Sequence, residues 1–180
     1  AHIAFTLSVQ AVMGAFLLLV LGGWMNVASI VGYVASAAWL PTLGVMLALM
    51  SFGLFRLNMH LGKPHRFYRG FNNWRLSPVS REIAGVTLFF AGLAGFGFFN
   101  LFPGFPFADL LKPASAVAGL LGLGVGGYYM IKLYRIPARP FWNHWHTDAD
   151  FVGAAFSLGG LLLALLAPVF DVLMRKMTSM

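Results

Sequence analysis

Three ionisable residues, Arg56, His60 and Glu82, have types and positions that suit proton transfer. Residues 3–55 contain no Asp, Glu, Lys or Arg, and Glu82 is the first acidic residue of the chain. If a helix continues through residues 56–60, Arg56 and His60 lie on one face, one turn apart. Histidine can take up or release a proton near neutral pH. We therefore predict a site in which His60 and Glu82 accept protons beside the fixed charge of Arg56.

Each of these residues also has a simpler interpretation. The long stem of an Arg near a helix end can reach the lipid headgroups, and a histidine at the membrane interface can be a hydrogen-bonded structural residue. Ser77 suits a helix N-cap, with Pro78 at the first helical position. A carboxylate at residue 82 would then be stabilised by the helix dipole.

The residues between His60 and Glu82 form a strongly basic connection. Its cations are Lys63, Arg66, Arg69, Arg75 and Arg81, with the aromatic residues Phe67, Tyr68, Phe71 and Trp74 among them. Such a cluster can set membrane topology and bind anionic lipid headgroups, or it can dock a protein or an anionic ligand. Aromatic and basic residues together are also found in nucleic-acid binders, a function that a membrane face disfavours.

A second basic connection, LYRIPARPFWNHWHTDAD, contains His144, His146, Asp148 and Asp150. The spacing H-x-H-x-D matches no structural zinc signature, and the chain has no cysteine. We therefore predict a structured interfacial loop near the first site, with no metal. All five histidines fall at the ends of apolar runs or in connections, which disfavours haem ligation inside the bundle.

The composition requires a membrane protein. The chain of 180 residues is 59% hydrophobic and only 9% charged, whereas a soluble domain carries about 25% charged residues. Five apolar runs are long enough to cross a bilayer as helices: about residues 3–25, 37–59, 82–101, 110–131 and 151–173. We predict an all-α, polytopic transmembrane bundle forming a single integral membrane domain over residues 1–180. The clustered glycines of the third and fourth runs would let helix backbones approach closely.

Five spans place both basic connections on one side of the membrane. That side would carry Arg56, Lys63, Arg66, Arg69, Arg75, Arg81, Lys132, Arg135 and Arg139, and the other side Lys112, Arg175 and Lys176. The excess of positive charge predicts that the basic side faces the cytoplasm.

The segment MHLGKPHRFYRGFNNWRLSPVSREIAG, residues 59–85, resembles the dimethyl sulfoxide reductase anchor-subunit family. The family pattern H-L-G-x-P begins at His60, and the pattern S-x-x-S-x-E-I falls on Ser77, Ser80 and Glu82. The stretch FTLSVQAVMGAFLL, with Gln10 and Gly14, is similar to the family's first helix. RPFWNHWHTDADFVGAAFSLGG is similar to the start of a later helix, so the resemblance covers most of the chain.

The resemblance implies a non-catalytic subunit of an oxidoreductase complex in the prokaryotic cytoplasmic membrane, active in anaerobic respiration. Such anchors exchange electrons with quinone, typically by oxidising menaquinol, and contain neither haem nor an iron–sulfur cluster. They hold a four-cluster iron–sulfur subunit, which connects to a molybdenum-pterin catalytic subunit. The family's quinol-site residues fall on Arg56, His60 and Glu82. Contacts to the quinone are expected from His60, Lys63, Arg66 and Tyr68.

Two departures from the family pattern leave alternatives open. The family usually has eight spans, so five imply either a truncated sequence or a short variant. Many relatives export their catalytic subunits, which would put the basic side outside; in others the partners stay in the cytoplasm and electrons can run into the quinone pool. Two further functions stay in competition: a small membrane transporter, and a purely structural anchor without a quinone site.

Overall fold

The computed structural model describes residues 2–59, 64–138 and 140–178, which are helical throughout apart from turns and connections. Five long helices are each apolar and long enough to cross a membrane. They are α1 (His2–Trp24), α3 (Trp39–Met59), α4 (Pro78–Leu101), α5 (Ala108–Tyr134) and α6 (Trp145–Thr178). These confirm the predicted all-α bundle of five spans.

The start of α4 agrees with the sequence in detail. Ser77 has an extended backbone and its side-chain oxygen accepts a hydrogen bond from the Ser80 amide at 3.4 Å, and Pro78 is the first helical residue. The first backbone N–H groups of a helix have no acceptor within the helix. A serine N-cap accepts a hydrogen bond from one of them, and a proline at the first position has no N–H to satisfy. This cap fixes where α4 begins, and therefore how far Glu82 lies from the end of the bundle.

The structure differs from the predicted spans where polar residues continue a helix. α6 begins at Trp145, six residues before the predicted start, and its first turns include Asp148 and Asp150. A count of apolar residues detects the part of a helix that lies in lipid, whereas the helix itself continues into the polar interface. Two short elements were also not predicted: α2 (Ala28–Ala35) and the 3₁₀ helix η1 (Pro64–Phe71).

Glycines bring two pairs of helices into backbone contact. A Cβ added at Gly92 would overlap the backbone of Gly119, and one added at Gly122 would overlap that of Phe89, so α4 and α5 pack closely. Gly14 and Gly159 meet in the same way between α1 and α6. Gly124 and Gly127, by contrast, face open space. The prediction that small residues serve close packing is therefore right for one face of α5 and wrong for the opposite face.

The core lies between α1, α3, α4 and α5. The Phe16 ring of α1 makes edge-to-face contacts with Phe89 and Phe96 of α4, with centroids 5.4 and 5.8 Å apart. Where α3 begins and α4 ends, Trp39 of α3 donates a hydrogen bond from Nε1 to Oδ1 of Asn100 at 3.1 Å. These contacts fix α3 and α4 relative to α1.

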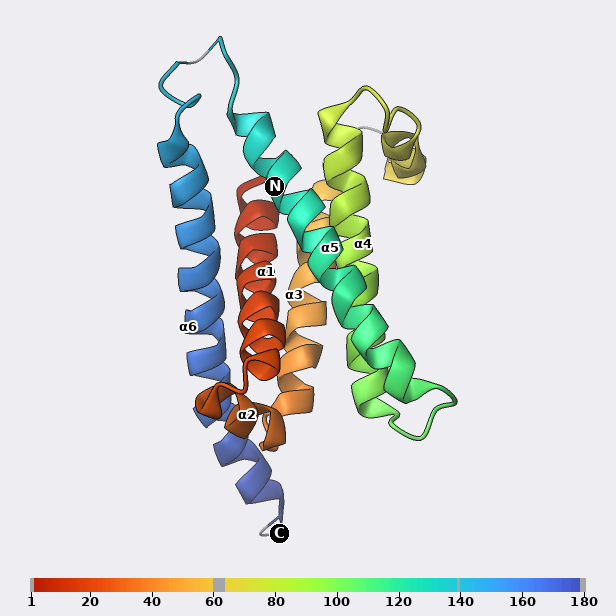
Figure 1. Cartoon of the computed structure of the whole chain (residues 1–180), viewed down its shortest axis with the longest axis vertical. Coiled ribbons are helices and arrows are strands. Elements are labelled where there is room, and N and C mark those ends of the chain that lie inside the picture. Colours follow the sequence, from red (N-terminus) through yellow and green to blue (C-terminus); the bar gives the residue numbers. More distant parts are fainter. Residues whose placement is uncertain (1, 60–63, 139, 179–180) are drawn as a thin grey trace.

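Both basic connections lie at one end of the bundle, as predicted (Figure 1). There α3 and α5 end, α4 and α6 begin, and η1 packs beside α4. We call this the basic end. Its described cations are Arg56, Arg66, Arg69, Arg75, Arg81, Lys132 and Arg135. The short helix α2, the turn between α4 and α5, and the end of α6 lie at the opposite end.

Candidate functional site

The two described members of the predicted proton-transfer site, Arg56 and Glu82, come from different helices at the basic end. Arg56 lies in the last turn of α3, and its side chain is exposed. Glu82 lies in the second turn of α4 and is half-buried. No hydrogen bond or ion pair joins the two side chains in the described part of the chain. His60 and Lys63 lie outside the described residues.

The 3₁₀ helix η1 covers the start of α4 next to Glu82. A Cβ added at Gly70 would come within 2.7 Å of the Cδ1 atom of Ile83, so η1 rests directly on the residue that follows Glu82. Arg66 and Tyr68, two of the predicted quinone contacts, belong to η1 and have exposed side chains. The helix η1, which carries Arg66 and Tyr68, therefore packs at the start of α4, and both side chains are exposed.

Arg81, which the sequence analysis counted only among the cations for topology, lipid binding or docking, fixes the end of the first basic connection. Its guanidinium donates hydrogen bonds to the carbonyl oxygens of Trp74 at 2.8 Å and Arg75 at 2.5 Å, and to the Tyr129 hydroxyl at 2.9 Å. It also lies 5.4 Å from the centroid of the Tyr129 ring. Arg81 therefore ties the connection both to α4 and to α5, directly beside Glu82.

Asn58 is a second residue that sequence reasoning missed. Its Oδ1 atom is buried and accepts no hydrogen bond from any described residue. An unsatisfied buried acceptor costs about 1–3 kcal/mol, so its presence near the end of α3 needs an explanation. The available sequence signal was an amide between Arg56 and His60, at the end of an otherwise apolar run.

The described part of the second basic connection is held by several side-chain contacts. Arg135 forms an ion pair with Asp148 at 2.7 Å, and Thr147 donates a hydrogen bond from its hydroxyl to the Trp142 carbonyl at 2.8 Å. The rings of Tyr134 and Trp142 stack with centroids 6.2 Å apart. In the described residues, no group of three His, Cys, Asp or Glu side chains could hold a metal ion.

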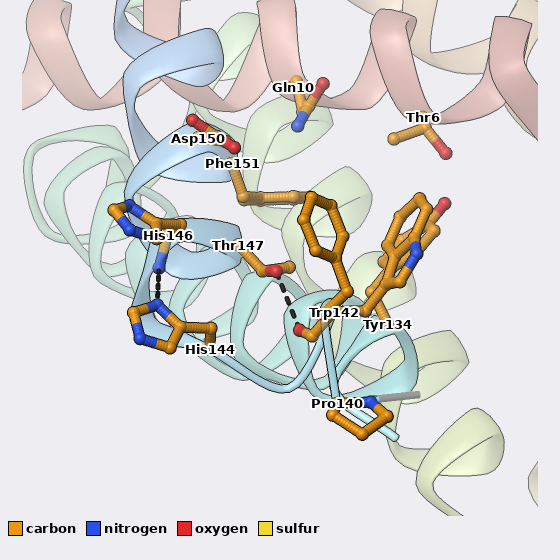
Figure 2. A pocket seen from close by; sticks show the side chains of 11 residues that line it. Thr6, Gln10, Tyr134, Pro140, Trp142, His144, His146, Thr147, Asp150 and Phe151 are labelled. Carbon is orange, nitrogen blue, oxygen red and sulfur yellow. Dashed lines mark hydrogen bonds between the residues drawn. The ribbon is translucent and has the colours of Figure 1, made fainter. Parts of the chain in front are cut away.

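This loop lines an open cavity of about 640 Å³ together with α1 and the start of α6. Figure 2 shows aromatic side chains, including Trp142 and Phe151, below Gln10 and Thr6 of α1. Gln10 is only 6% exposed and makes no hydrogen bond to a described residue. No residue of α3, η1 or α4 lines this cavity, so it is separate from the surroundings of Glu82.

Two comparisons with known proteins relate the chain to the membrane anchor subunit of dimethyl sulfoxide reductase. The family model described as DMSO reductase anchor subunit (DmsC) matches residues 1–179. The chain is also 36% identical over 126 residues to a protein of Haemophilus influenzae whose name makes it component C of an anaerobic dimethyl sulfoxide reductase. That match covers 69% of this chain and 44% of the relative, so the chain spans less than half of the relative's length. No solved structure matches the chain.

Proposed function

Because the chain belongs to the DMSO reductase anchor subunit family, we propose that it anchors an oxidoreductase complex in the prokaryotic cytoplasmic membrane. There it exchanges electrons between membrane quinol and a partner iron–sulfur subunit. That subunit connects to a molybdenum-pterin catalytic subunit, and menaquinol is the proposed donor. The five apolar helices support the membrane location.

The half-buried position of Glu82 at the basic end is the observation on which the quinol site depends. A carboxylate placed away from water in a spanning helix is costly and is usually functional. Glu82 follows Arg81 and precedes Ile83, on which η1 rests, and it lies at the same end of the bundle as Arg56 of α3. A group that can accept a proton at this end of the bundle supports the proposed quinol site.

The proposed roles follow from the chemistry of the substrate. Oxidation of a quinol releases two electrons and two protons, and its hydroxyls need acceptors within about 2.6–3.2 Å, or through one water. His60 is the proposed direct acceptor, and Glu82 carries the proton onward. Arg56 stabilises the developing negative charge on the substrate oxygen, because it forms no ion pair with Glu82 that would occupy it.

The exposed cations and aromatics of η1 and the following turn are the proposed docking surface for the iron–sulfur subunit. Tyr68 and Trp74 are 54% and 59% exposed, and Arg66, Arg69 and Arg75 are exposed as well. Tyr, Trp and Arg are enriched at the centres of protein interfaces. Docking there would place the partner's nearest cluster beside the quinol site, as electron transfer requires.

Quinol-linked turnover of site variants tests this function. In Glu82→Gln and His60→Ala, turnover should fall at least roughly a hundredfold, the lower end of the range for general acid–base catalysis. The partner subunits should still co-purify. Asp109→Asn is the matched control, because Asp109 is a carboxylate in the first turn of α5 at the opposite end of the bundle.

The outcomes separate the remaining alternatives. Normal turnover in both Glu82→Gln and His60→Ala would contradict the site. A complex that assembles but never reacts with quinol, even without substitutions, would indicate a purely structural anchor. Purification without any iron–sulfur or molybdenum subunit would contradict the anchor function and favour a transporter.

A further inference from the structure

We propose that the cavity between α1, the end of α5 and the start of α6 binds a second quinone ring, apart from the Glu82 site. The proposal depends on the proposed function in one respect, the identity of the ring as a quinone. The binding itself is argued from the cavity.

The cavity has the size and lining of a small-molecule site. Its volume of about 640 Å³ falls within the range of roughly 300–1,000 Å³ that is typical of ligand pockets. Tyr134, Trp142 and Phe151 supply aromatic walls, and a few polar groups lie among them. Such a lining suits a flat ring that carries one or two hydrogen-bonding oxygens.

Gln10 provides the polar contact within the membrane-spanning part of the wall. At about 1.5 Å per residue it lies roughly 12 Å along α1 from His2. Its side chain lines the cavity, is more than nine-tenths buried and has no hydrogen-bond partner among the described residues. The Gln10 amide is not among the fully buried unpartnered atoms of the described residues, so it opens into the cavity. A quinone carbonyl in the cavity could accept a hydrogen bond from the Gln10 Nε2 group.

The chemistry of the wall favours a quinone over a lipid phosphate. The lining holds the carboxylate of Asp150 and the imidazoles of His144 and His146 but no described Lys or Arg, and Arg135 of the same connection pairs with Asp148. An anionic headgroup would therefore meet a like charge without a free described cation in the lining. A neutral ring with carbonyl oxygens meets no such penalty, and its apolar tail can follow the exposed apolar faces of α6.

Photolabelling tests the proposal in native membrane vesicles that contain the complex. The probe is an azido-naphthoquinone with a short alkyl tail, and labelled peptides are mapped by mass spectrometry. We expect labelling within residues 3–14 and 140–155 that an excess of unlabelled naphthoquinone suppresses. In Gln10→Leu this labelling should fall at least roughly fivefold, because one buried hydrogen bond is lost.

Two further variants distinguish the loss of a ligand contact from misfolding as the cause of reduced labelling. Trp142→Ala removes an aromatic wall in a loop, without changing a spanning helix, and should also lower the labelling. Ser8→Ala is the matched control on α1: Ser8 faces Gly53 of α3 and does not line the cavity, so labelling should be unchanged.

Labelling confined to residues 56–82, or labelling of the cavity that excess naphthoquinone does not suppress, would overturn the second site. Quinol turnover measured on the same vesicles reports on the proposed function separately. Normal turnover without cavity labelling would contradict only this inference, whereas cavity labelling without turnover would contradict only the electron exchange.

Discussion

Arg81 of α4 donates a hydrogen bond to the hydroxyl of Tyr129 on α5, with a distance of 2.9 Å between Nη1 and the hydroxyl oxygen. The same guanidinium holds the carbonyl oxygens of Trp74 and Arg75. One side chain therefore connects two spanning helices to the end of the first basic connection. Because Glu82 follows Arg81 directly, the geometry of that connection and the position of the carboxylate depend on each other.

Replacing Arg81 by Gln should loosen this end of the connection. A typical hydrogen bond contributes about 0.5–1.5 kcal/mol to stability, and one to a charged group about 1.5–3 kcal/mol. Because the three bonds of Arg81 are partly exposed, we expect their combined loss to cost about 2 kcal/mol. Limited proteolysis with chymotrypsin should show faster cleavage near Tyr68 and Trp74. Tyr129→Phe, which removes one of the three bonds, should have a smaller effect.

Arg75→Gln is the matched control for the Arg81 variant. Arg75 lies in the same connection, and its side chain only approaches the Trp74 ring, at 5.8 Å from the centroid. Cleavage rates close to wild type are expected. Equal acceleration in Arg75→Gln and Arg81→Gln would mean that loss of charge, rather than loss of the three bonds, loosens the connection.

Glycine substitutions on α5 should depend sharply on which face they occupy. A Cβ at Gly122 would overlap the backbone of Leu88 and Phe89, whereas one at Gly124 meets nothing within 4 Å. Overpacking costs typically about 1–3 kcal/mol, or more where only backbone can move. Gly122→Ala should therefore lower the melting temperature in detergent. Gly124→Ala should keep or raise it, because alanine favours a helix by about 1 kcal/mol over glycine. Equal melting temperatures would contradict the close α4–α5 contact.

The fold was largely predictable because bilayer thickness sets the length of an apolar helix. The cap interpretation of Ser77 and Pro78 located the start of α4, because both are local signals, whereas the apolar run marked its span only from residue 82. The short helix α2 was not predicted, because its eight residues are too few for a span and the connection that contains it is almost uncharged. Its position depends on a tertiary contact, the hydrogen bond of 2.6 Å between the hydroxyls of Tyr33 and Thr42.

The candidate site was predictable only where chemistry was visible in the residue type. Arg56 and Glu82 stood out because charge is rare in this chain, and the structure brings their helices to the same end. The function of Arg81 depends on carbonyl oxygens of Trp74 and Arg75, whose positions no sequence pattern encodes. The cavity beside Gln10 is lined by segments far apart in the chain, and no sequence pattern encodes their approach.

Tyr33 of α2 should make stability depend on pH in the alkaline range. Burial raises the pKa of the Tyr33 hydroxyl above its usual value of 10.0; the Thr42 hydrogen bond opposes this and the charge of Asp171 adds to it. A raised pKa in the folded state means that the folded protein holds this proton more tightly than the unfolded chain. The stabilisation is thus fully present below pH 10 and is lost as the pH rises through the folded-state pKa.

Thermal unfolding between pH 9 and about pH 11 measures this effect. Wild-type protein should lose more stability over that interval than Tyr33→Phe, which has no hydroxyl to ionise. Tyr68→Phe is the control, since Tyr68 lies exposed at the basic end and should follow the wild-type curve. Parallel curves for wild type and Tyr33→Phe would show that the folded state does not perturb this hydroxyl.

Asn58→Leu tests whether the buried amide near the end of α3 serves the proposed quinol site. Leucine has a similar volume and leaves no polar atom unsatisfied, so the free energy of unfolding should stay constant or rise by about 1 kcal/mol. If Asn58 holds substrate or an ordered water beside Arg56, quinol-linked turnover should nevertheless fall by roughly tenfold, the equivalent of 1.4 kcal/mol. Higher stability together with lower turnover would separate a functional amide from a structural one. Lower stability with unchanged turnover would assign Asn58 to the packing of α3.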